Sequence, residues 1–137
     1  LIIVKMFAQP GNRGPVHCTA SGKALLAFLP PDKLEQVLSQ VDFVRYTDET
    51  ITDKDQLLKE LKRIKQEGYA LDWGEMEEHV RCIAAPIFNH EGKAVASISI
   101  SGPSNRITTY YMKNELVDIV VDIANRVSRK LGYSNLP

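Results

Sequence analysis

Apolar and polar residues follow two different periods along the chain, and each period predicts a type of element. Apolar residues recur every three or four positions after Thr52, which indicates an amphipathic helix that begins at Thr52 or Asp53 and ends at Gly68. The same spacing predicts a long helix over 112–131, ended by Gly132. The stripes expected to be buried are Leu57, Leu58, Leu61 and Ile64 in the first helix, and Met112, Leu116, Ile119, Val120, Ile123, Ala124, Val127 and Leu131 in the second.

Two shorter helices are predicted before them. Thr19 or Ser21 can cap a helix whose apolar body runs over 24–29. The Pro30-Pro31 pair ends it, and a second short helix is expected over 32–40. Apolar and β-branched runs predict strands over 1–8 and 69–73.

A β-hairpin is predicted over 80–88 and 93–101, joined by a four-residue loop with Gly92. With this loop, Phe88 pairs with Lys93 and Cys82 pairs with Ser99. Because side chains alternate along a strand, one face of the hairpin carries apolar residues and the other carries small, weakly polar ones. The second set is Cys82, Ala84, Ser97, Ser99 and Ser101. Such a face either packs closely against a helix, or forms the floor of a pocket, or faces water.

The order of elements predicts an α+β fold, in which helices pack on an antiparallel sheet. The 137 residues are the size of one domain, and 44% of them are hydrophobic, enough for a core. Seventeen basic residues balance seventeen acidic ones, which argues against a module that binds nucleic acid by itself. No apolar run has the length of a membrane span, and the two cysteines are expected to be free thiols.

Four motifs in this order resemble the C-terminal effector-binding domain of IclR-family bacterial transcription regulators. They are His17-Cys18-Thr19-Ala20-Ser21-Gly22-Lys23-Ala24-Leu25-Leu26-Ala27, Gly68-Tyr69-Ala70-Leu71-Asp72, Val80-Arg81-Cys82-Ile83-Ala84-Ala85-Pro86-Ile87-Phe88, and Ser97-Ile98-Ser99-Ile100-Ser101-Gly102-Pro103 with Arg106-Ile107. Together they cover nearly the whole chain.

The resemblance implies a GAF-like fold with a single effector pocket and no cofactor. Residues 1–137 would form one effector-binding domain that lacks its first elements, because the chain begins without Met inside a strand-like run. The winged helix-turn-helix domain that contacts DNA would lie outside this chain. The resemblance also implies a cytoplasmic regulator that assembles as a homodimer or homotetramer and is not an enzyme.

The resemblance further implies the site residues. In the family, two adjacent backbone amides at the start of a pocket helix bind a small carboxylate, and these match Ala20 and Ser21. Polar pocket side chains match Asp72, Cys82, Ser99 and Ser101, and an apolar wall falls near Ile3, Met6 and Val80. The physics agrees, because the first N–H groups of a helix lack intrahelical acceptors and favour an anion. Small residues at 20–22 would let a ligand approach this backbone.

Other interpretations of the same residues remain open. Cys82 is the candidate thiol of a GAF-like redox enzyme, and the chain is also consistent with an oligomerisation module without a ligand. His17, Cys18, His79 and Cys82 offer four ligands that suit zinc. Lys23 is expected to be solvated, Arg81 to be solvated or paired with an acidic neighbour, and Trp73 to close the pocket or to select a ring-bearing effector.

Overall fold

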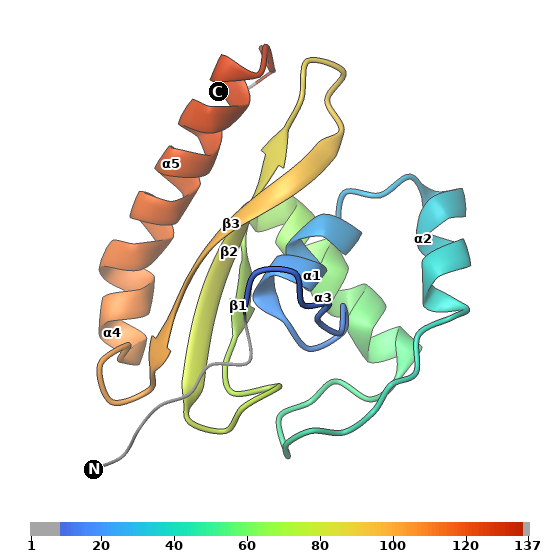
Figure 1. Ribbon diagram of the computed structural model, residues 1–137, viewed down its shortest axis with the longest axis vertical. Coiled ribbons are helices and arrows are strands. Elements are labelled where there is room, and N and C mark those ends of the chain that lie inside the picture. Colours follow the sequence, from blue (N-terminus) through green and yellow to red (C-terminus); the bar gives the residue numbers. More distant parts are fainter. Residues whose placement is uncertain (1–8, 136–137) are drawn as a thin grey trace.

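A three-stranded antiparallel sheet lies between two layers of helices in the computed structural model, which describes residues 9–135 (Figure 1). The strands are β1 (Ala70–Asp72), β2 (Val80–Phe88) and β3 (Ala94–Pro103), in the order β1-β2-β3. This confirms the predicted α+β class. The strand expected over 1–8, with Ile3 and Met6 of the proposed apolar wall, lies outside the described residues.

The predicted faces of the hairpin are correct, although the predicted register is wrong by two residues. Cys82 pairs with Ser101 and Ala84 with Ser99, and a β-bulge interrupts the ladder next to Phe88, which pairs with Ala94. The loop is one residue longer than expected, and the bulge adds one more residue to β3. Because side chains alternate with a period of two, these two shifts together keep the side chains of 96–101 on their predicted faces.

One face of the sheet carries α1 (Ala20–Leu26), α2 (Pro31–Leu38) and α3 (Lys54–Glu67). Asp53 caps α3, and Gly68 ends it with a φ of 85°, as the sequence predicted. Small residues let α1 approach the sheet closely, and the core on this face is formed by Ala20, Ala24, Leu57, Leu61, Ile64 and Ala84 with their neighbours. Leu58, which the sequence placed in this core, is exposed instead.

The other face carries α4 (Thr109–Tyr111), the π-helical turn η1 (Met112–Leu116) and α5 (Val117–Lys130). Its core contains Ile83, Ala85 and Ile87 of β2 and the helical residues Met112, Leu116, Val120 and Ala124. The predicted single helix thus begins earlier and contains a π turn. Because a π turn holds more residues than an α turn, it changes which side chains face the sheet, and Ile119 is exposed. Leu131 is also exposed, at the C-cap of α5.

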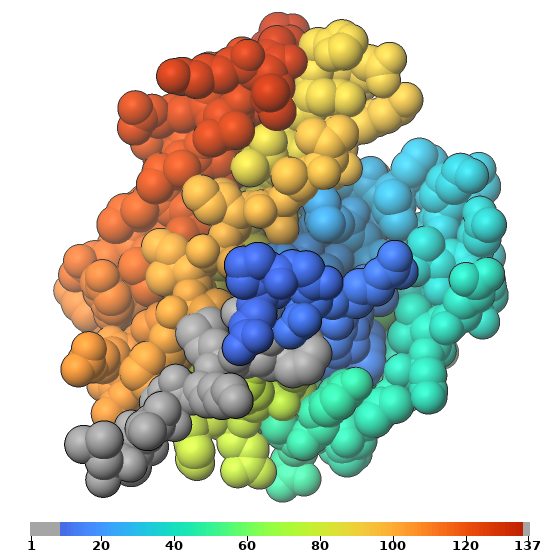
Figure 2. Space-filling view, in the orientation of Figure 1, coloured from blue at the N-terminus to red at the C-terminus, as the bar shows by residue number. Residues whose placement is uncertain are grey.

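Figure 2 shows the segment that follows Gln9 at the surface, between β3 and the layer of α1 to α3. Gly11 adopts a φ of 86° in this segment, which includes a turn at 10–11. None of the described helices is long and apolar enough to cross a membrane.

Candidate functional site

A cavity of about 570 Å³ lies between the start of α1, the loop over 73–79 that joins β1 to β2, and the adjoining ends of β2 and β3. All the predicted site residues within the described part of the chain line it, namely Ala20, Ser21, Asp72, Val80, Cys82, Ser99 and Ser101. The structure therefore brings together residues from four separate motifs. Their role as effector ligands stays a prediction.

The first wall of the cavity is the start of α1. Thr19 is the N-cap, and its hydroxyl oxygen accepts a hydrogen bond from the Gly22 amide at 3.2 Å and donates one to the Pro15 carbonyl at 2.7 Å. The Lys23 amide donates to the Thr19 carbonyl at 3.0 Å. The amides of Ala20 and Ser21 precede these bonds, in the first turn, where N–H groups have no intrahelical acceptor. Two backbone donors therefore lie at the edge of the cavity.

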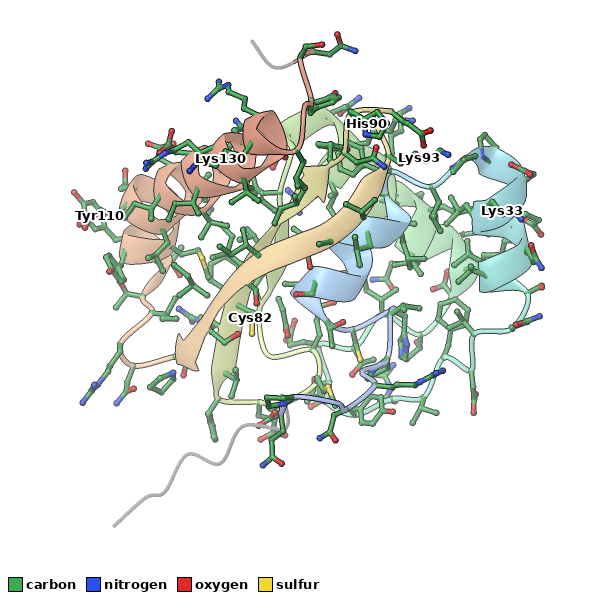
Figure 3. The ribbon with its side chains drawn as sticks, turned by 45° about the horizontal axis from the view of Figure 1, so that its top comes forward. Lys33, Cys82, His90, Lys93, Tyr110 and Lys130 are labelled. Carbon is green, nitrogen blue, oxygen red and sulfur yellow. The ribbon has the colours of Figure 1, made fainter. Side chains whose placement is uncertain are left out.

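The second wall is the small-residue face of the hairpin. Around Ala84 this face packs against α1, and Ala84 is fully buried beside Ala20 and Ala24. The part of the face with Cys82, Ser99 and Ser101 lines the cavity. Cys82 lies on the side of the sheet that faces α1 (Figure 3). The face thus packs against a helix at one point along the strands and lines the cavity at another, where Ser99 is also exposed to solvent.

Asp72 forms the third wall, at the end of β1. One of its carboxylate oxygens accepts hydrogen bonds from the amides of Gly74 at 3.0 Å and Glu75 at 2.7 Å, which fixes the turn that leaves the strand. Burial raises the pKa of Asp72 above its ordinary value, and these two hydrogen bonds and the charge of Lys23 oppose that rise. A buried carboxyl group therefore contributes to the lining.

Several lining residues were not predicted from the sequence. They are Gln9, Pro10, Asn12, Gly14 and Val16 from the segment before α1, Leu25 of α1, and Met76 and Glu77 from the loop over 73–79. The proline and glycine residues between 10 and 15 indicated a loop but gave no sign of where it packs. The acidic run at Glu75, Glu77 and Glu78 marked the second loop without showing which side chains face inward.

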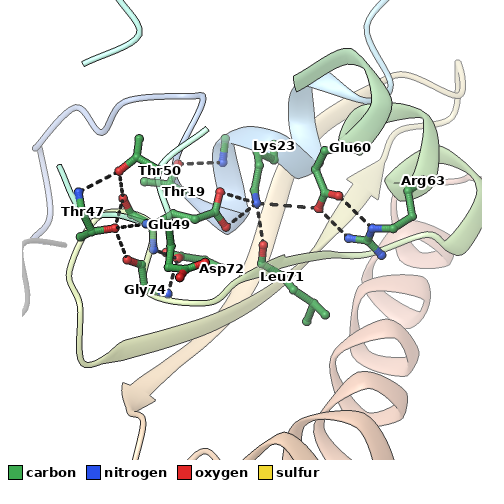
Figure 4. Close-up of polar contacts among 12 residues, drawn as sticks. Thr19, Lys23, Thr47, Glu49, Thr50, Glu60, Arg63, Leu71, Asp72 and Gly74 are labelled. Atoms are coloured by element: carbon green, nitrogen blue, oxygen red, sulfur yellow. Dashed lines mark hydrogen bonds and ion pairs between the residues drawn. The ribbon is translucent and has the colours of Figure 1, made fainter. Parts of the chain in front are cut away.

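Lys23 is buried, so the expectation of a solvated lysine was wrong. Its Nζ donates to the two carboxylate oxygens of Glu75 at 2.8 and 2.6 Å and to the carbonyl of Leu71 at 2.7 Å (Figure 4). Glu60 of α3 lies 3.8 Å away and is itself paired with Arg63. A buried ammonium is tolerated only where counter-charges and acceptors surround it, and here three elements supply them.

The expectations for Arg81 and Trp73 were also wrong. Arg81 donates to the Ile107 carbonyl at 2.9 Å, and its guanidinium lies 5.0 Å from the centre of the Trp73 ring. Trp73 packs against the core beneath α5 and does not line the cavity. It neither closes the cavity nor offers a ring to an occupant.

The other chemistry proposed for this region has little support in the geometry. Burial raises the pKa of Cys82 to about 11 and that of Cys18 to about 12, so both are protonated thiols at neutral pH. His79 is exposed, whereas His17 is buried and hydrogen-bonded to the Val44 carbonyl at 2.9 Å. No three His, Cys, Asp or Glu side chains in the described residues are grouped to hold a metal ion.

Comparison with known proteins adds independent evidence. Residues 3–129 match the family model described as the bacterial transcriptional regulator IclR C-terminal domain. The transcriptional regulator KdgR of Dickeya chrysanthemi is 39% identical over 134 residues, which cover 98% of this chain and 44% of KdgR. The chain thus spans about half the length, or less, of the curated relatives it matches.

Solved structures agree with this match. The IclR protein of Thermotoga maritima superposes with a TM-score of 0.89 at 39% identity, over 96% of this chain and 53% of that one. The inducer-binding domain of an Acinetobacter PobR double mutant, in complex with 3-hydroxybenzoic acid, gives 0.80 at 29% identity, over 90% and 74%. With the four motifs and the fold, these matches show that the chain belongs to the IclR family of bacterial transcriptional regulators and corresponds to their C-terminal domain.

Proposed function

We propose that this chain is the effector-sensing domain of its regulator and that the cavity beside α1 binds a small organic acid. The observation that carries the proposal is the convergence of the first α1 amides, the Asp72 carboxyl group and the Ser99 and Ser101 hydroxyls on one cavity. A volume of about 570 Å³ lies within the range of small-molecule sites.

In this proposal each wall has a separate task. The carboxylate of the effector accepts hydrogen bonds from the amides of Ala20 and Ser21, where the aligned peptide dipoles of a helix favour negative charge. Ser99, Ser101 and Cys82 contact the other polar atoms, while Leu25 and Val80 contact the carbon skeleton. Asp72 receives a hydroxyl group or a bridging water, because an ionised carboxylate would repel the acid.

The proposal extends to the parent protein. Contact with DNA takes place through a winged helix-turn-helix domain outside this chain, in the cytoplasm, and the effector alters operator affinity. The 137 residues form one effector-binding domain. The domain performs no catalysis, and the regulator assembles as a homodimer or homotetramer.

A thiol enzyme that uses Cys82 is the less favoured alternative. A redox or nucleophilic cysteine needs a lowered pKa, yet burial raises the pKa of this thiol, and the charges of Asp72, Glu75 and Glu77 raise it further. The nearby hydroxyl of Ser101 opposes the rise without reversing it.

Calorimetric titration and thermal unfolding with a panel of two- to eight-carbon carboxylic acids test this function. The panel includes 3-hydroxybenzoic acid, and the amide of each acid serves as the uncharged control. A specific acid at about 100 times its Kd stabilises the fold by about 2.7 kcal/mol, and its amide does not. If no acid binds, or if amides bind equally well, the carboxylate site is refuted.

The hairpin provides a matched pair of variants. Ser99 lines the cavity, whereas Ser97 lies on the same face of β3 and does not line it. Loss of one hydrogen bond predicts that Ser99→Ala weakens binding of the selected acid by about two- to tenfold, while Ser97→Ala leaves Kd unchanged. Equal losses in the two variants would contradict the proposed orientation of the site.

A further inference from the structure

The loop over 73–79 has an unusual polar connection to the rest of the domain. Glu75 is buried within this loop, and its neighbours Met76 and Glu77 line the cavity. Its carboxylate accepts two hydrogen bonds from Lys23, and its carbonyl accepts one from the Thr50 hydroxyl at 2.5 Å. One residue thus joins the cavity loop to α1 and to the segment over 47–50.

Lys23 connects the same loop to the opposite wall. Its backbone directly follows Ser21 and Gly22, which line the cavity, while its ammonium group points away from the cavity toward Glu75. The side chain is 1% exposed. Within residues 9–135, further hydrogen bonds also join this loop to the helical layer. Those that the structure shows run from the Thr47 hydroxyl to the carbonyls of Gly74 and Glu75 and from the Thr50 hydroxyl to Glu75.

We propose that Lys23 is a positioning residue: through its buried ion pair with Glu75, it holds the loop over 73–79 closed against α1 and so shapes the effector cavity. The consequence for effector affinity rests on the function proposed above, whereas the closure of the loop does not. A buried ion pair contributes little net stability, but removing one partner leaves the other charge buried and unpaired. The pair therefore specifies where the loop lies more than it stabilises the whole fold.

The protonation of Glu75 makes closure of the loop depend on pH, and this dependence can be measured. Burial raises the pKa of Glu75 from its ordinary value of 4.5 to about 7, and Lys23 opposes that rise. The charged groups that face it are Lys23 of α1, Asp72 of β1 and Glu60 of α3, and both carboxylates favour the protonated form. The Glu75 carboxyl group thus binds a proton more tightly when the loop is closed than when it is open.

The sign of the pH dependence follows from linkage. Because ionised Glu75 is harder to bury than protonated Glu75, closure weakens as the pH rises from 4.5 through about 7, and Lys23 limits this loss by pairing with the ionised form. The equilibrium constant for opening therefore rises between pH 6 and pH 8. Burial also raises the pKa of Asp72, which adds a change of the same sign, so a variant is needed to isolate Glu75.

Hydrogen exchange of the ligand-free chain measures this opening directly. Exchange rates of peptides covering 73–79 are corrected for intrinsic pH dependence and compared at pH 6 and pH 8. We expect exchange to become faster from pH 6 to pH 8 in the wild type and to change much less in Glu75→Gln. Glu78→Gln, in the same loop but exposed, is the matched control and keeps the wild-type slope. An unchanged slope in Glu75→Gln, or no slope in the wild type, overturns the proposal.

A second set of variants tests Lys23. Lys23→Met keeps the length of the side chain and is expected to increase opening of 73–79 more than tenfold at pH 8, because Glu75 loses its counter-charge. Adding Glu75→Gln removes the buried charge and should reverse most of this loss. If Lys23 only stabilised α1, adding Glu75→Gln would not restore closure of the loop. Lys33→Met on the exposed surface of α2 serves as the control. If Lys23→Met does not fold, the comparison of wild type with Glu75→Gln decides the matter.

These measurements separate two kinds of failure. Exchange in the absence of any ligand does not depend on whether the cavity binds an acid. A chain that shows the pH signature but binds no acid would refute the proposed function and leave the positioning role intact.

Discussion

Cys82 shows how the surroundings of one residue set its chemistry. The thiol lines the cavity and is therefore open to small reagents, yet burial raises its pKa from 9.0 to about 11. Thiolate, and not thiol, is the nucleophile, so a rise of two pKa units lowers the reactive fraction at pH 8 by about a hundredfold. Cys82 suits a hydrogen-bonding role in the cavity better than a redox role.

Alkylation by iodoacetamide tests this at the residue scale. In a Cys18→Ser background at pH 8, we expect Cys82 to react about a hundredfold more slowly than a model peptide cysteine, with the rate rising steeply up to pH 11. Mass spectrometry of timed samples gives the rate. A rate near that of the free peptide would instead support the thiol-enzyme alternative.

At the scale of elements, the start of α1 depends on a close contact within the chain. A Cβ atom on Gly22 would lie 2.7 Å from the Thr19 hydroxyl oxygen, 2.7 Å from the Val16 Cα and 2.9 Å from the Val16 carbonyl oxygen. Glycine is thus required here because the preceding segment crosses over the helix. Access for a ligand, the reason that the sequence suggested, is secondary.

Gly22→Ala is therefore expected to destabilise the fold. Alanine gains about 1 kcal/mol of helix propensity over glycine, but the clash with backbone atoms of Val16 must displace the entry segment, and such overpacking costs about 1–3 kcal/mol. We expect a net loss, measured by urea unfolding. Gly14→Ala is the control, since its Cβ would meet only the Thr19 methyl group at 3.7 Å. A Gly22→Ala variant as stable as the wild type would contradict the importance of this contact.

The elements also show what could be predicted from the sequence. The alternation of small and apolar residues in β2 and β3 fixed which side chains share a face, and this survived a wrong register because the two shifts cancelled. Helical periodicity located α3 and its caps. It wrongly predicted that Ile119 is buried. A π turn at 112–116 rotates the residues that follow it relative to the sheet, and the spacing of apolar residues does not reveal such a turn.

The site was predictable only in part, for a related physical reason. Residues such as Ser99 and Cys82 could be assigned to one face from local alternation, together with the family motifs. The burial of Lys23 could not, because it depends on Glu75, 52 positions further along the chain, and on Glu60 of α3. The spacing of apolar and polar residues does not show which charged residues of distant segments form an ion pair.

At the scale of the whole molecule, one sheet carries two cores. β2 contributes Ala84 to the core beneath α1 and α3, and it contributes Ile83 and Ala85 to the core beneath α5. Loss of packing on either face therefore disturbs the same strand. We expect the two cores to unfold together, in a single cooperative transition.

Adjacent leucines on α3 test this coupling. Leu57 is 0% exposed in the first core, whereas Leu58 is 36% exposed, although the sequence assigned both to the buried stripe. Leu57→Ala should lower the free energy of unfolding by about 2–5 kcal/mol, because it removes buried methyl groups and leaves a cavity. Leu58→Ala should cost less than about 1 kcal/mol, as expected for a surface position. Chemical denaturation followed by the fluorescence of Trp73, which lies in the opposite core, and by circular dichroism reports both faces. Coincident, equally shifted curves in Leu57→Ala are the expected result, and two separated transitions would show that the cores are independent.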